Sequence, residues 1–211
     1  MQLINYLNKY FLTRADLLRL SATSENEFEL LQRKKLMPAS SYKLTIASNC
    51  HSFFGEHNTQ QTIEYYSKGY TSWLNFLQSI NDNNDAFRVF STRYKQKLIE
   101  LKRLGLVSLD AKVNAGMDLH IKEEWRHFIN GTYGLCTKSG LPECIAAKEV
   151  AILIINEIIV NDNLSDDDIE RLTQAVNLLD SASSLFAPHE RENSSRERLV
   201  NKVRRKYQLS H

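Results

Sequence analysis

Apolar residues are spaced along the chain as a series of helical stripes around one segment that is apolar on nearly every side. The run 145–160 is interrupted only by Lys148, Glu149, Asn156 and Glu157. A helix that is hydrophobic all round is normally buried on all sides. We therefore expect this segment to be a central helix that amphipathic helices cover.

The covering helices are predicted from apolar residues spaced three and four apart, which places them on one helical face. This pattern occurs in segments 59–80, 85–104, 118–130 and 165–187. Pro142 fits the first turn of the central helix, where a missing N–H costs no hydrogen bond. The pattern predicts a helical bundle.

The first fifty residues predict a different, smaller unit. Thr13 is followed three residues later by Asp16, and Ser24 by Glu27, which is the spacing of a capping box. Two short helices are expected after these caps. Apolar and polar residues then alternate over 42–46, which is typical of a short strand or wing.

This span resembles the winged helix-turn-helix of the MerR group of regulators. The matching residues are Leu12, Thr13, Leu17, Leu20, Ser21, Ser24, Phe28, Leu36, Met37 and Pro38. The resemblance implies a DNA-reading second helix, but Glu25, Glu27 and Glu29 stand where that group places basic and aromatic residues. Carboxylates repel DNA phosphates, so these acids disfavour nucleic acid and favour a packing or partner-docking role.

Two glycine-containing stretches extend the resemblance to the whole chain. They are Ser-Phe-Phe-Gly-Glu-His at 52–57 and Gly-Thr-Tyr-Gly-Leu-Cys-Thr at 131–137. With them the chain is similar to a bacterial family of unknown function, some members of which are labelled natural-product biosynthesis proteins. That label implies a pathway association and supplies no catalytic residues.

Together these patterns predict a mainly α fold. We expect a MerR-like winged helix-turn-helix at 1–48, a helical bundle around the buried central helix at 49–188, and a basic C-terminal tail at 189–211.

Composition narrows the class of protein. Apolar residues make up 42% and charged residues 25% of the 211, with a formal net charge of +2, as in an ordinary soluble globular protein. No signal-peptide pattern opens the chain, and the longest apolar run is interrupted by polar residues, which disfavours a membrane span. Three cysteines are too few for a disulfide framework. A cytoplasmic protein with reduced thiols is expected, and its oligomeric state stays open.

The loop before the central helix is the first candidate for a ligand site. Backbone N–H groups at a helix N-terminus bind anions, and a thiol there can have a lowered pKa. A small acidic ligand is therefore expected near this helix end. The candidate ligand-binding residues are His51, His57, Tyr133, Cys136, Thr137, Glu143 and Cys144.

A zinc or thiol site is the alternative use of the same region. Zinc requires four ligands, or three with an open position, and the chain could offer Cys50, His51, His57, Cys136 and Cys144. No paired Cys-x-x-Cys or His-Glu-x-x-His spacing is present, so no cofactor is predicted. The simpler interpretation has the 49–57 loop inserting Phe53 and Phe54 into the core.

Three charged clusters offer further chemistry. His120 with Glu124, and Glu123 with His127, are four residues apart on one predicted helix; they form either an acid–base or metal candidate, or exposed ion pairs. A basic stripe lies on the helix 85–104. The tail either frays or binds nucleic acid through Arg196, Arg198, Lys202, Arg204 and Arg205.

The sequence therefore favours a non-catalytic protein that binds a partner or a small ligand. A DNA-binding regulator and an accessory enzyme or zinc-binding protein are the alternatives, drawn from different classes of function.

Overall fold

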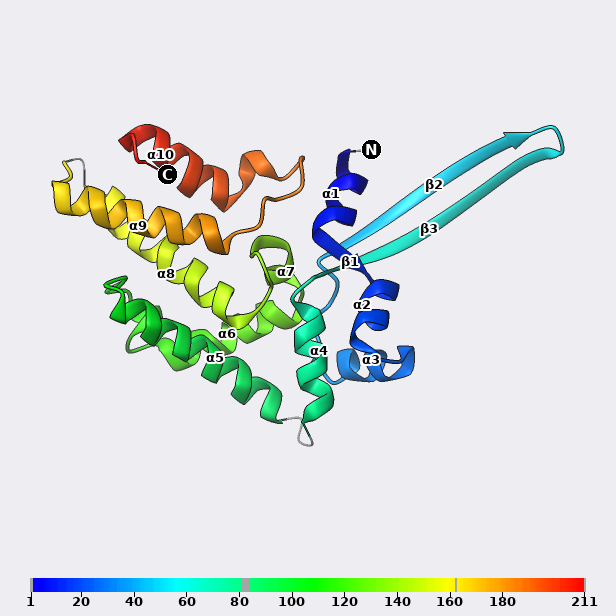
Figure 1. Ribbon diagram of the computed structural model, residues 1–211, viewed down its shortest axis with the longest axis horizontal. Coiled ribbons are helices and arrows are strands. Elements are labelled where there is room, and N and C mark those ends of the chain that lie inside the picture. The colour runs from blue at the N-terminus through cyan, green and yellow to red at the C-terminus, as the bar shows by residue number, and fades with distance from the viewer. Residues whose placement is uncertain (1, 81–83, 162, 211) are drawn as a thin grey trace.

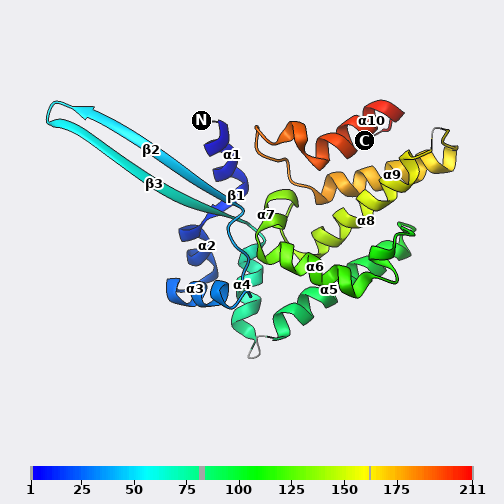
Figure 2. The ribbon, with the colours of Figure 1, turned by 180° about the vertical axis from the view of Figure 1, so that it is seen from behind.

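The computed structural model describes residues 2–80, 84–161 and 163–210 of the chain. Figure 1 shows three regions: an N-terminal lobe, a long two-stranded hairpin that projects from it, and a helical body that contains the C-terminus. Figure 2 shows the same arrangement from behind. The predicted mainly helical class is confirmed, with one small sheet added to it.

In the N-terminal lobe, the two predicted caps mark the starts of two short helices, α2 (Arg14–Ser21) and α3 (Glu25–Arg33). Thr13 accepts a hydrogen bond from the backbone N–H of Asp16 at 3.1 Å, and Ser24 accepts one from Glu27 at 3.3 Å. Such caps satisfy backbone donors that the first helical turn leaves unpaired. The elements are α1 (Gln2–Tyr10), β1 (Phe11–Thr13), α2 and α3.

The hairpin consists of β2 (Tyr42–Ser52) and β3 (Gly55–Ser67), and the antiparallel sheet has the order β1-β3-β2. The sequence predicted a helix over 59–80, and this prediction is wrong for 59–67. Only α4 (Tyr70–Ser79) forms from that segment. Residues 59–65 pair with β2 instead, and 65–67 pair with β1. A short apolar repeat fits a strand as well as a helix, and tertiary pairing decides between them.

The tip of the hairpin contradicts a second prediction. Phe53 and Phe54 do not enter the core; they are 97% and 95% exposed. The segment 49–57 is therefore no loop against the body, but the outer end of the two strands.

The helical body is arranged around α8 (Pro142–Ile159), as predicted. Pro142 occupies the first turn, and 11 of the 18 residues of the helix are buried. The neighbouring helices α5 and α9 make most of the contacts with it. The other elements of the body are α5 (Asn84–Arg103), η1 (Ala111–Val113), α6 (Met117–Ile129), α7 (Thr132–Cys136) and α9 (Asp166–Ala182).

The C-terminal segment folds back onto α9. It contains η2 (Arg191–Asn193), η3 (Glu197–Asn201) and α10 (Lys202–Tyr207). Leu199, Val200 and Val203 are buried in the same apolar cluster as α8 and α9. Most of the segment predicted as a basic tail is thus packed on the body, and the predicted boundary at residue 48 lies within β2.

Apolar side chains form three clusters, and the seam between two of them positions the candidate site. One small cluster joins Tyr6, Leu7 and Phe11 of the lobe to Tyr65 and Ala187. The cluster of α8, α9 and α10 lies beside it. A polar contact joins the first of these clusters to the C-terminal segment, since the Tyr42 hydroxyl donates to Glu190 at 2.7 Å.

Candidate functional site

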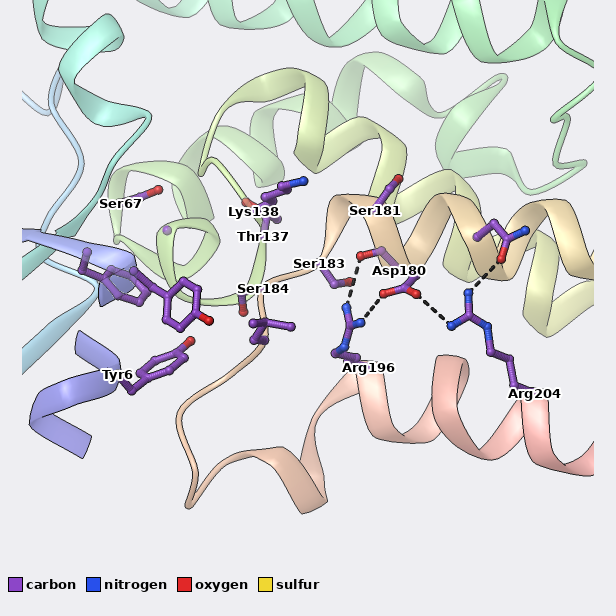
Figure 3. Close-up of a pocket in the computed structure, with 15 residues that line it drawn as sticks. Tyr6, Ser67, Thr137, Lys138, Asp180, Ser181, Ser183, Ser184, Arg196 and Arg204 are labelled. Carbon is purple, nitrogen blue, oxygen red and sulfur yellow. Dashed lines mark hydrogen bonds and ion pairs between the residues drawn. The ribbon is translucent and has the colours of Figure 1, made fainter. Parts of the chain in front are cut away.

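A cavity of about 600 Å³ lies where the N-terminal lobe meets α9 and the C-terminal segment (Figure 3). Its volume is within the range of about 300–1,000 Å³ that small-molecule sites occupy, and such sites often lie between structural units. One wall is aromatic and the other is charged. The two walls come from opposite ends of the chain.

The aromatic wall is formed by α1 and β1. Tyr6 and Tyr10 are four residues apart on α1 and lie on one helical face, with ring centroids 5.1 Å apart. Phe11 follows, with its centroid 5.9 Å from that of Tyr6. Burial raises the pKa of the Tyr6 phenol, so its hydroxyl stays neutral and can donate a hydrogen bond. Leu185 adds an aliphatic surface to the cavity.

The charged wall is built around Asp180 in the last turn of α9. Its carboxylate forms an ion pair with Arg196 and a second, at 2.8 Å, with Arg204. Arg204 also donates to Asn177 at 2.8 Å. Figure 3 shows both guanidinium groups directed toward Asp180 from the C-terminal segment. With Lys138 included, three cations face one carboxylate, so this wall is positive.

Hydrogen-bond donors without partners near the cavity favour a ligand that carries hydrogen-bond acceptors. Arg204 Nε and the hydroxyl of Ser183 are buried and have no hydrogen-bond partner among the described residues. Lys138 is exposed, and no partner for its ammonium is found within the described ranges. A buried donor left unpaired costs free energy. The Lys138 ammonium is the accessible group of the three, and a ligand with acceptor oxygens would pair with it.

The floor of the cavity is the segment that follows α7. Thr137 forms an isolated antiparallel bridge with Ser183, and the Lys138 N–H donates to the carbonyl of Ala182 at 2.8 Å. The buried Lys148 donates to the carbonyl of Cys136 at 2.9 Å. These bonds attach the floor to both α8 and α9, so it is rigid before any ligand arrives.

Gly134 permits the close packing beneath the floor. A Cβ atom built there would lie 2.1 Å from the Ser41 hydroxyl oxygen and 2.8 Å from the Tyr70 hydroxyl oxygen. Neither distance is compatible with a side chain, so only glycine allows the lobe and α7 to approach this closely.

Comparison with protein-family models gives one match, to "Family of unknown function (DUF6058)", over residues 86–208. This is more than half of the chain. The chain belongs to this family. No curated protein and no solved structure matches the chain.

The matched region contains some of the residues that line the cavity and leaves others outside. The DUF6058 region contains the floor and the charged wall, including Thr137, Asp180 and Arg204. The aromatic residues Tyr6 and Phe11 lie outside it. The cavity is therefore completed where the N-terminal lobe packs on the DUF6058 region.

The ligand-binding residues predicted from sequence do not all converge. Thr137 lines the cavity, whereas Cys136, the last residue of α7, is not among the residues that line it. Tyr133 lies nearby but is directed elsewhere, since its hydroxyl donates to Glu124 at 2.6 Å. Glu143 forms a two-point ion pair with Arg93, at 2.6 and 3.0 Å.

The remaining thiols and imidazoles are separated. Cys144 is a half-buried free thiol of α8, whereas Cys50 is exposed and pairs across the hairpin with His57. His51 forms an ion pair with Glu56 at 3.1 Å, also on the hairpin, which projects away from the body (Figure 1). In the described part of the chain, no group of three or more His, Cys, Asp or Glu side chains has the arrangement of a metal site.

The residues predicted to contact nucleic acid have mixed environments. Arg196 and Arg204 are directed inward to Asp180, and Arg205 pairs with Glu197 at 2.6 Å. Arg198 and Lys202 are exposed. Ion pairs within the chain therefore account for three of the five predicted residues.

The pair His120 and Glu124 is buried, which contradicts its interpretation as an exposed ion pair. Their side chains are 7% and 6% exposed, and His120 Nε2 lies 3.8 Å from Glu124 and 3.7 Å from Glu149. Burial raises the pKa of Glu124 to about 7 and lowers that of His120. Both groups are therefore neutral over part of the ordinary pH range, as their low exposure requires.

Sequence analysis missed Tyr6, Tyr10, Lys138 and Asp180 as site residues. The chain did carry a signal for Asp180: an acid in the last turn of a helix faces the negative end of the helix dipole, so it needs cations nearby. The basic C-terminal segment supplies them. For the tyrosines, spacing alone does not distinguish a cavity wall from a core.

Proposed function

We propose that this protein is a non-catalytic binding protein whose cavity holds a small amphipathic anion. The ligand has an aromatic or aliphatic body that packs on Tyr6, Tyr10 and Phe11, and a carboxylate or phosphate that faces Lys138 and the arginines. The observation that carries the proposal is the opposition of an aromatic wall to a positive wall with unpaired donors. A role in a cytoplasmic biosynthetic pathway is part of this proposal.

The MerR-like resemblance fits a docking lobe better than a DNA-reading one. Arg14, at the start of α2, forms ion pairs with Glu25, Glu29 and Glu64. This cation is therefore already neutralised by the acids of α3. Free cations are the main source of affinity for DNA phosphate. The first half of α3 presents Glu25, Glu27 and Glu29 instead, and its one arginine, Arg33, lies in the last turn.

Calorimetric titration with matched pairs of small molecules tests the proposal. Each pair consists of an aromatic or alkyl acid and its neutral amide or alcohol of the same shape. We expect the acid to bind and the neutral partner to bind roughly tenfold more weakly, because a hydrogen bond to a charged group contributes about 1.5–3 kcal/mol.

Two lysine variants provide the control. Lys138→Gln removes a cavity cation whose ammonium has no partner among the residues that the structure describes, so it should weaken binding of the acids alone. Lys122→Gln removes an exposed cation on α6, away from the cavity, and should leave binding unchanged. Equal binding of acids and amides, or an equal effect of the two variants, would contradict an anion site.

A further inference from the structure

The outer part of the β2–β3 hairpin, residues 47–62, packs against no other element among the described residues. We call it the outer arm. Every residue in it is exposed, although its two strands pair without interruption from Tyr42↔Tyr65 to Ser52↔Gly55. Figures 1 and 2 both show the arm extending away from the lobe and the body. An isolated two-stranded hairpin is only marginally stable in water.

Side-chain pairs between β2 and β3 stabilise the hairpin. Along one face these are Lys43 with Glu64 at 2.9 Å, Thr45 with Thr62 at 3.2 Å, and His51 with Glu56 at 3.1 Å. Cross-strand pairs of this kind stabilise a sheet and set its register. These side-chain pairs therefore fix the register of β2 against β3.

Both edges of the outer arm are open to further pairing. β1 pairs with β3 only at its base, over Tyr65, Tyr66 and Ser67. Beyond that point, alternate backbone N–H and C=O groups of each strand point away from the hairpin. Proteins usually protect such edges with lysine, proline or bulges. Residues 47–62 contain no lysine, arginine or proline, and the register has no bulge.

The tip adds an exposed apolar surface. The rings of Phe53 and Phe54 meet edge to face with centroids 5.3 Å apart. A phenylalanine buries about 150–250 Å² when it packs fully, so the two together offer about 300–500 Å². A stable interface needs about 800 Å² from each partner. The tip would supply roughly half of it, and strand pairing along the arm could supply the rest.

We propose that the outer arm is a self-association arm: two copies of this chain pair edge to edge through residues 47–62, with the Phe53–Phe54 tip of each packed on the other arm. Such a contact is isologous and closes as a two-fold dimer.

Charge favours a second copy over other occupants. Glu56 is the one carboxylate in the arm, and it lies 3.1 Å from His51, so each arm carries at most one negative charge and repulsion between two arms is small. The arm has no cation of the kind that binds nucleic-acid phosphate or anionic lipid.

Sedimentation equilibrium of the full chain under reducing conditions tests this proposal; the reductant prevents a disulfide through Cys50 from imitating assembly. We expect a reversible monomer–dimer equilibrium. The double variant Phe53→Ser, Phe54→Ser should raise the dissociation constant roughly tenfold or more, as expected for central aromatic anchors. Asn49→Lys, which places a cation on the edge, should do the same by repulsion between the arms.

Two matched variants outside the arm complete the experiment. Leu109→Ser removes an apolar side chain that is 86% exposed, and Asn161→Lys adds a cation at an exposed position. Both should leave the equilibrium unchanged. A chain that stays monomeric at its highest soluble concentration overturns the proposal, as does a dimer insensitive to the arm variants. Retention of a different protein through Phe53 and Phe54 by a monomeric chain also overturns it.

Discussion

The outer arm and α8 show two ways in which this chain holds a regular element in place. In α8, 11 of 18 residues are buried, and most of them are aliphatic. In the outer arm every residue is exposed, and most of those between Ala47 and Thr62 are small or polar. The helix depends on burial of apolar surface, which contributes about 25 cal/mol per Å². The arm depends on backbone pairing and on side-chain pairs across the strands.

Because of this difference, substitutions in the two regions should change different measurable quantities. Changes in α8 should alter the free energy of unfolding and little else. Changes in the arm should leave that quantity nearly constant while they alter association. The cavity lies between these extremes, because its walls are packed on one side and open on the other.

The largest expected effect is in α8. Ile154 is fully buried between α8 and its neighbours, so Ile154→Ala removes apolar contacts and leaves a cavity. We expect a loss of about 2–5 kcal/mol in the free energy of unfolding, measured by urea denaturation. A loss below about 1 kcal/mol would mean that α8 is not the centre of the core.

The second effect is a pH dependence in the helical body. Burial raises the pKa of Glu124 from 4.5 to about 7. The folded chain therefore holds this proton more tightly than the unfolded chain does. The stability that the proton contributes is complete below about pH 4.5 and is lost as the pH rises through about 7.

The variant Glu124→Gln isolates this contribution. A tenfold change in proton affinity corresponds to about 1.4 kcal/mol, so wild type should lose about 3 kcal/mol relative to the variant between pH 4.5 and 8. Burial lowers the pKa of His120, which adds an opposite slope below pH 6.5 in wild type. Parallel pH profiles would show that Glu124 keeps its usual pKa.

A third comparison sets an enclosed ion-pair network against an exposed ion pair. Asp180→Asn leaves Arg196 and Arg204, whose side chains are 20% and 13% exposed, without their carboxylate. We expect a loss of about 1–3 kcal/mol in unfolding free energy. Glu56→Gln breaks an exposed pair on the arm and should cost less than about 0.5 kcal/mol. Thermal denaturation of both variants in low and high salt checks this order.

Much of the body was predictable because its signals are local. Pro142 at the start of α8, and Ser165 with Asp168 at the start of α9, mark helix ends through backbone chemistry that acts within one turn. The run 145–160, which is apolar on nearly every side, then indicates that this helix is buried, whichever helices cover it. In the hairpin, the alternation over 42–46 predicted the start of β2, but β3 was not predictable by the same means. Ile63 and Tyr66 fit a helical spacing, and only their pairing with Leu44 of β2 and Leu12 of β1 makes the segment a strand.

The site was less predictable than the fold. Its walls join Tyr6 with Arg204, from opposite ends of the chain, and periodicity carries no information about such a meeting. Thr137 was predicted from its place before a helix N-terminus, and the structure places it at the cavity floor for a different reason, its bridge to Ser183. Asp180 was the one distant residue with a local signal, the unfavourable charge at the C-terminal end of α9.

The smallest expected effect gives the sharpest test of the comparison. Phe53→Ala removes a large aromatic side chain, a change that costs about 3–5 kcal/mol in a core. At the tip the ring is 97% exposed, so at concentrations low enough for the chain to be monomeric we expect a change within about 0.5 kcal/mol. Urea denaturation of dilute wild-type and variant protein measures it. A loss of several kcal/mol in dilute monomer would show that the ring packs within its own chain. A loss that grows with protein concentration would instead locate its contacts between copies, since association stabilises the folded state by mass action.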